Sequence, residues 1–210
     1  FGIEEAEVVR VSSNAYPQCS LYERTTALVP LPDGGSYVVD VFRVRGGTRH
    51  ALGFQCNGKL VETTGVELAA LERRHKWLSG FRAGTPAGTT MGRWQDGDAF
   101  LDFHLLSVPG RLVVADAPGW RSDKGSERNA PPIQQIFAEN EAAEGEAESL
   151  YISVWAPHRG KSPVSAIALL GTTPDGACAV RIRLGDREDV VAFAPDPAPR
   201  SRAARRALAD

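Results

Sequence analysis

The side chains best suited to acid–base chemistry or metal binding are scattered along this sequence of 210 residues. No two histidines stand two or four positions apart, the spacings that direct two imidazoles at one metal ion. The cysteines are equally dispersed and form no CxxC pair. The residues concerned are His50, His75, His104 and His158, with Cys19, Cys56 and Cys178. The sequence therefore predicts no metal site.

The motifs of hydrolases and nucleotide-binding proteins are missing as well. The sequence contains no GxSxG elbow, no Walker loop and no GxGxxG turn. The run Arg45-Gly46-Gly47-Thr48 is typical of a turn between strands rather than of a phosphate-binding loop. We therefore expect no cofactor, no catalytic residues and no self-contained catalytic centre.

Asp40 is the acidic residue whose position is most informative. On a strand from Ser36 to Arg45 it shares one face with the apolar residues Val38, Phe42 and Val44. A carboxylate on an inward face needs a partner. A four-residue turn before this strand would place Asp40 opposite Ala27, with Arg24 three positions away; His50 or an arginine of another strand is the alternative. We expect Asp40 to be a buried structural acid.

A cationic group around Gly46-Gly47 is the candidate site for a ligand. Arg43, Arg49 and His50 flank this turn, and such donors attract an acidic sugar. The alternative is structural: the arginines pair with nearby acids and His50 caps the sheet. Trp120 is the tryptophan best placed for exposure and for stacking against a sugar ring. These four residues are the candidate carbohydrate-binding residues.

Short segments rich in β-branched and aromatic residues must position these side chains. About eleven such segments alternate with turn signals, the pattern of an all-β, antiparallel β-sandwich. Pro32-Asp33-Gly34-Gly35 predicts a hairpin, and Gly46-Gly47 is expected to add a third strand as a meander. Along Ala99–Leu105, Asp102 and His104 alternate with apolar residues, which predicts a half-buried strand.

The remaining segments are expected to be peripheral. Glu67–Ser79 places apolar residues on one stripe and is the single candidate for a short helix. Five glutamates between Glu139 and Glu148 predict an exposed loop. Residues 1–194 are expected to form one sandwich domain, and residues 195–210 a Pro-rich linker with a basic tail.

Composition and charge narrow the class of protein. Hydrophobic residues make up 42% of the chain, enough for a sizeable core, and the formal charge of −2 gives no electrostatic footprint for nucleic acid. No apolar stretch is long enough to cross a membrane, so we expect a soluble protein, either periplasmic or cytoplasmic.

The three cysteine thiols are expected to be core or half-exposed, or to form one disulfide in an oxidising compartment. Because the chain begins with Phe1, we expect a processed product or a piece of a longer protein.

Several runs of residues resemble the later β-sheet part of heparinase II/III-like polysaccharide lyases. These runs are Tyr22–Val29, Tyr37–Val44, Gly46–His50 and Glu148–Gly160, and together they span most of the chain. The resemblance implies a bacterial-type lyase in which an N-terminal helical toroid packs against a C-terminal antiparallel sandwich. It also implies cleavage of uronic-acid polysaccharides, such as glycosaminoglycans or alginate, by β-elimination.

The resemblance further implies that most catalytic residues belong to the toroid, and that metal-binding residues lie on strands that would precede Phe1. This sequence departs from the family pattern at Gln55, where a histidine is expected after Phe54. We therefore expect a scaffold that partners a helical toroid and binds acidic polysaccharide. The alternatives are a free-standing carbohydrate-binding module and a structural sandwich that binds protein.

Overall fold

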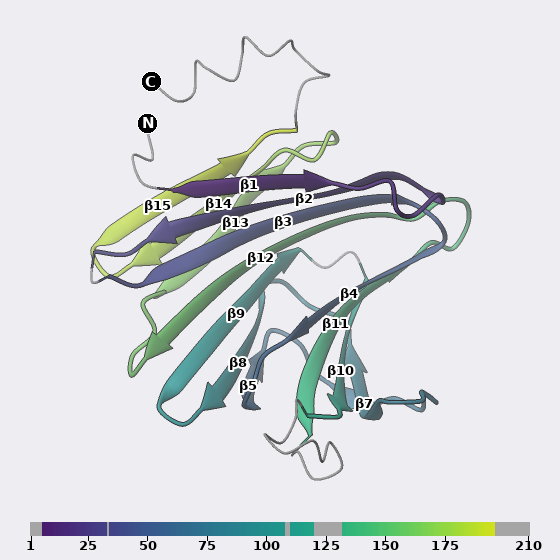
Figure 1. The fold of residues 1–210 in the computed structure, drawn as a ribbon, viewed down its shortest axis with the longest axis horizontal. Coiled ribbons are helices and arrows are strands. Elements are labelled where there is room, and N and C mark those ends of the chain that lie inside the picture. The colour runs from purple at the N-terminus through teal and green to yellow at the C-terminus, as the bar shows by residue number, and fades with distance from the viewer. Residues whose placement is uncertain (1–5, 33, 108–109, 120–131, 196–210) are drawn as a thin grey trace.

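The computed structural model describes residues 6–32, 34–107, 110–119 and 132–195, and these ranges fold into three antiparallel sheets (Figure 1). The central sheet has seven strands, in the spatial order β1 (Glu7–Ser12), β2 (Cys19–Pro30), β3 (Ser36–Gly46), β12 (Glu148–Arg159), β9 (Ala99–Ser107), β8 (Thr90–Asp96) and β5 (Lys59–Thr64). The five-stranded sheet has the order β4 (Arg49–Gln55), β11 (Ile133–Glu141), β10 (Arg111–Ala117), β7 (Ser79–Gly84) and β6 (Ala69–Ala70). The three-stranded sheet consists of β13 (Ala166–Thr172), β14 (Cys178–Leu184) and β15 (Arg187–Phe193). The predicted all-β, antiparallel sandwich is confirmed.

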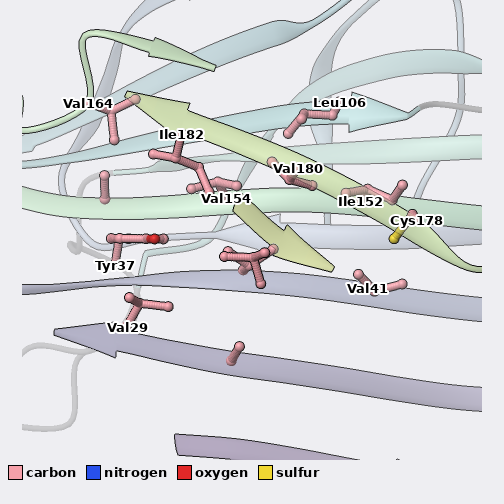
Figure 2. Packing of buried hydrophobic residues seen from close by; sticks show 14 residues of the cluster. Val29, Tyr37, Val41, Leu106, Ile152, Val154, Val164, Cys178, Val180 and Ile182 are labelled. Carbon is pink, nitrogen blue, oxygen red and sulfur yellow. The ribbon is translucent and has the colours of Figure 1, made fainter. Parts of the chain in front are cut away.

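The central sheet is covered on both faces, which explains why its inner strands are almost continuously apolar. From β3, Tyr37, Val39 and Val41 join a core shared with the three-stranded sheet, which Figure 2 shows around Val180 and Ile182. Phe42 and Val44 of β3 point to the other face. There they join a second core, between the central and five-stranded sheets, that includes Phe54, Trp94 and Leu112. Alternate residues of one strand therefore serve two cores.

The turn at Gly46-Gly47 joins two sheets instead of closing a meander. Gly46 and Gly47 have φ values of 106° and 72°, and a Cβ on Gly46 would lie 2.2 Å from the carbonyl oxygen of Gln18. The glycines let the chain leave β3 and enter the five-stranded sheet, where β4 pairs with β11. The predicted three-strand meander is therefore wrong.

The largest departure from the sequence-based expectation lies between residues 57 and 98. The described ranges contain fifteen strands rather than about eleven, and the four that the sequence pattern did not show are β5, β6, β7 and β8. The helix expected at Glu67–Ser79 is wrong, since this segment pairs briefly with β7 and then continues without a helix. Its Leu71 and Leu78 still pack on the five-stranded sheet, against Phe81 and Val113. The apolar spacing in this segment therefore reflects packing on the sheet and not the periodicity of a helix.

The hairpins signalled by turn residues are present. β2 pairs with β3, and β13, β14 and β15 pair in sequence. The connection between β2 and β3 spans five residues, because Pro30 pairs with Ser36. Asp40 consequently faces Thr26, one position away from the expected Ala27.

The described residues contain no helix that could span a lipid bilayer.

Candidate functional site

Asp40 is a buried acid whose partner is Arg24. The Arg24 guanidinium donates two hydrogen bonds, from Nε to Oδ1 at 2.7 Å and from Nη2 to Oδ2 at 3.0 Å. The Ser153 hydroxyl lies 3.5 Å from Asp40 Oδ2 and accepts a hydrogen bond from Trp155 Nε1 at 3.0 Å. The hydrogen bond to Asp40 raises the pKa of Arg24. Asp40 therefore anchors a charged pair on the face of the central sheet beside the five-stranded sheet.

Replacement of Asp40 by alanine is expected to lower the free energy of unfolding by about 1–3 kcal/mol, because Arg24 and Ser153 lose their shared acceptor. Thermal melts of the purified variant measure this loss. Asp98→Ala is the control, since Asp98 is exposed and lies 3.7 Å from its nearest cation, on Arg159. A parent-like melting temperature for Asp40→Ala, together with loss of glycan binding, would contradict a structural role.

A cleft opens beside this pair, between the outer strands of the central sheet and the edge strand β4. Its volume is about 390 Å³, within the range of small-ligand pockets. The lining consists of Val9, Val11, Ser12, Ser13, Tyr22, Arg24, Thr26, Phe42 and Leu52. Arg24 is the charged residue of this lining, and its guanidinium lies 5.9 Å from the centre of the Phe42 ring. The cleft can therefore receive a small anionic or aromatic group.

A second polar site lies on the face of the five-stranded sheet that points away from the central sheet. Three arginines converge there on the buried carboxylate of Glu139, and we call Arg49, Arg73, Arg111 and Glu139 the arginine cluster. Arg73 donates two hydrogen bonds, at 2.6 and 2.8 Å, while Arg49 donates one at 2.9 Å and Arg111 one at 3.0 Å. Hydrogen bonds from Arg73 and Arg111 outweigh burial and lower the pKa of Glu139 to about 2. The cluster holds three positive charges around one negative charge.

The predicted cationic group is only partly assembled. Arg49 belongs to the arginine cluster. Arg43 instead pairs with Glu23 of β2 and donates to the carbonyl oxygen of Asp175, at the turn of the three-stranded sheet. Arg43 and Arg49 therefore contact different sheets. Trp120 lies outside the described residues.

His50 is buried between the sheets and both of its ring nitrogens have partners. Nε2 lies 2.7 Å from the Gly46 carbonyl oxygen, which can only accept, so Nε2 carries the proton. Nδ1 lies 2.7 Å from Ser149 Oγ, which also accepts a hydrogen bond from Asn140. His50 therefore links the crossover turn to β12.

A third polar group surrounds Asp102, which is buried rather than on a solvated face. Arg93 donates to it from Nε at 2.6 Å and from Nη2 at 2.9 Å, and His158 Nε2 lies 3.3 Å from Oδ2. Burial alone would raise the pKa of Asp102, but the hydrogen bonds and charge of Arg93 lower it to about 2. Burial also lowers the pKa of His104, two residues further along β9.

Sequence reasoning missed most of the arginine cluster. Glu139 was expected in an exposed loop, yet it is a buried residue of β11, and the loop begins after Glu141. Its partners Arg73 and Arg111 come from distant segments, so no spacing in the sequence connects them. The detectable signal was the end of an apolar strand at Glu139, directly after Phe137-Ala138. Within the described ranges, no three His, Cys, Asp or Glu side chains gather as metal ligands.

The fold is similar to that of solved polysaccharide lyases. A mutant of heparan sulfate lyase HepC from Pedobacter heparinus aligns with a TM-score of 0.52 and 12% identity. A heparinase III with methylated lysines aligns with a TM-score of 0.53 and 17% identity. Each alignment covers 90% of this chain but 26% of the lyase chain, so this chain corresponds to about a quarter of those proteins. At these identities the likeness establishes the fold alone.

The comparisons at the level of sequence give no match. No protein-family model matches this chain, and no curated protein does. The similarity to heparinase II/III-type lyases therefore rests on the arrangement of the strands.

Proposed function

We propose that this chain is the β-sandwich region of a heparinase II/III-type polysaccharide lyase that cleaves uronic-acid polysaccharide by β-elimination. In this proposal the sandwich supports a helical catalytic toroid and contributes residues that contact the glycan. The observation that carries the proposal is the structural alignment over 90% of this chain with about a quarter of each lyase. The free-standing carbohydrate-binding module is the second candidate, favoured by the surplus of positive charge in the arginine cluster.

The chemistry of β-elimination supports a scaffolding role. The reaction needs a neutralised C5 carboxylate, a base for the C5 proton and an acid at the leaving oxygen, all at one sugar. The buried carboxylates Asp40, Asp102 and Glu139 are each held by arginine, and both nitrogens of His50 are bonded within the fold. These groups stabilise the sandwich, and the proton-transfer groups are assigned to the toroid.

The surface beside the cleft offers a place for the toroid to pack. Val9 and Val11 are exposed on β1 and line the cleft, and Leu28 is exposed on the neighbouring strand. Clustered exposed apolar side chains mark interaction surfaces in folded proteins. We assign this part of the central sheet to the contact with the catalytic domain.

The isolated chain is expected to fold and to show no lyase activity, because in this proposal the base and acid of the reaction belong to the toroid. The measurement is the ultraviolet absorbance of the unsaturated uronide released from heparan sulfate, alginate or hyaluronan, with a complete heparinase III as the positive control. Circular dichroism checks that the chain is folded in the same samples. Robust turnover by residues 1–210 alone would refute the scaffold assignment.

A further inference from the structure

The outer face of the five-stranded sheet carries an ordered row of side chains along the paired strands β4 and β11. In the ladder Arg49 faces Glu141, Ala51 faces Glu139, Gly53 faces Phe137 and Gln55 faces Gln135. These eight residues alternate with the inward residues Leu52, Phe54, Ile136 and Ala138, so they share the outward face. From Arg49 to Gln55 the row extends about 20 Å, at 3.4 Å per residue.

One end of the row is cationic. The side chains of Arg49 and Arg111 are 50% and 43% exposed, whereas Glu139 is 6% exposed. Arg111 uses Nε for Glu139, and among the described residues its two terminal amino groups have no partner. Three guanidiniums surround one buried carboxylate, so the arginine cluster has a net charge of two positive units. The exposed Glu141, opposite Arg49, reduces this local net charge to one positive unit. Guanidinium groups in this arrangement are suited to a carboxylate or sulfate group.

The middle and the far end of the row suit a sugar ring. Phe137 is partly exposed and its ring lies over Gly53, where an added Cβ would come within 3.2 Å of it. Ala51 and Gly53 are small and exposed, so these two positions of the edge strand β4 carry no large side chain beside the Phe137 ring. Beyond it, Gln135 donates to Gln55, which places two amide groups at the far end. The partly exposed ring of Phe137 lies between the cations and the amides, and this order matches the acidic groups, apolar ring faces and hydroxyls of an acidic sugar chain.

We propose that Arg49, Arg111 and Phe137 form a binding site for an acidic oligosaccharide, with the acidic group at the two arginines and a sugar ring against Phe137. The inference rests on the proposed function for the nature of the ligand, and it places the contact on the outer face rather than in the cleft beside Arg24. Arg73 is the residue that holds Glu139 in place, through its two hydrogen bonds and its position 5.4 Å from the Phe81 ring.

The test is calorimetric titration of residues 1–210 at low salt with a heparan sulfate oligosaccharide, an alginate oligosaccharide and a neutral maltooligosaccharide. The parent chain is expected to bind at least one acidic probe and not the neutral one. Arg49→Gln with Arg111→Gln should weaken that binding about ten-fold and reduce its dependence on salt, while the Arg73–Glu139 pair keeps the fold. Phe137→Leu should weaken binding without changing the salt dependence. Arg45→Gln is the matched control, because Arg45 is equally exposed and pairs with Glu148 outside the row.

Three results would overturn the inference. One is equal affinity of the parent and the double variant for the acidic probes. Another is a loss of affinity for the acidic probes in Arg24→Gln but not in the double variant. That result would place the glycan in the cleft and would leave the proposed lyase function unchanged. The third is the absence of binding to any acidic probe, which would assign the row to a protein contact. The lyase assignment itself is decided separately, by the activity of the complete protein.

Discussion

Glu139→Gln is expected to lower the free energy of unfolding by about 3 kcal/mol, since the variant keeps the shape of the side chain but removes the charge that gathers three arginines. Folding lowers the pKa of Glu139 from 4.5 to about 2, which corresponds to about 3 kcal/mol in favour of the ionised form. Urea denaturation followed by tryptophan fluorescence measures the change. Glu148→Gln is the control, because Glu148 pairs with Arg45 on the surface and should change stability by less than about 1 kcal/mol.

The same variant should alter the response to acid. A carboxylate whose pKa falls on folding stabilises the fold fully above its unfolded pKa, and the contribution is lost as the pH falls through the folded value. For Glu139 this window extends from about pH 4.5 to about pH 2. Glu139→Gln should therefore lose less stability than the parent across this window. Parallel stability curves for the two proteins would contradict the assigned role of the charge.

Asp102→Asn is expected to be as damaging, with a loss of about 3 kcal/mol, because it leaves the buried side of Arg93 without a charged partner. The carboxylate also lies beside His158, so one substitution disturbs contacts to β8 and β12 together. Urea denaturation measures the loss, and Asp98→Asn, an exposed acid at the turn before the same strand, should change stability by less than about 0.5 kcal/mol. A loss for Asp102→Asn no larger than for Asp98→Asn would show that the ion pair contributes nothing.

The fold was predictable where strands carry their own signal. β3 and β12 are rich in β-branched and aromatic residues because both of their faces are buried, and the sequence pattern located them. β8 gave no such signal because its inward residue Gly92 faces Ile136 so closely that a Cβ would lie 2.9 Å from Ile136 Cδ1. A glycine that permits close packing of two sheets leaves no mark in a hydrophobic pattern. The hydrophobic pattern therefore did not show β8.

The polar sites were predictable to a smaller extent, because their partners are far apart in sequence. The inward position of Asp40 indicated a buried acid. Its partner Arg24 could not be identified, because the turn is one residue longer than expected and shifts the register so that Arg24 lies within hydrogen-bonding distance. Arg49 was recognised as a candidate ligand residue, yet Arg111 and Glu139 meet it only through the pairing of β10 with β11 and β11 with β4. Long-range strand pairing created these groups, and no local spacing encodes it.

In the proposed lyase, this sandwich functions beside a helical catalytic domain. The decisive measurement is the release of unsaturated uronide by the complete protein encoded by the reading frame that contains Phe1–Asp210, compared with residues 1–210 alone. We expect the complete protein to carry a helical region before the sandwich and to cleave at least one uronic-acid polysaccharide, while the isolated chain is inactive. A reading frame that encodes the sandwich alone, or a complete protein that binds acidic glycans without cleaving any, would contradict this expectation.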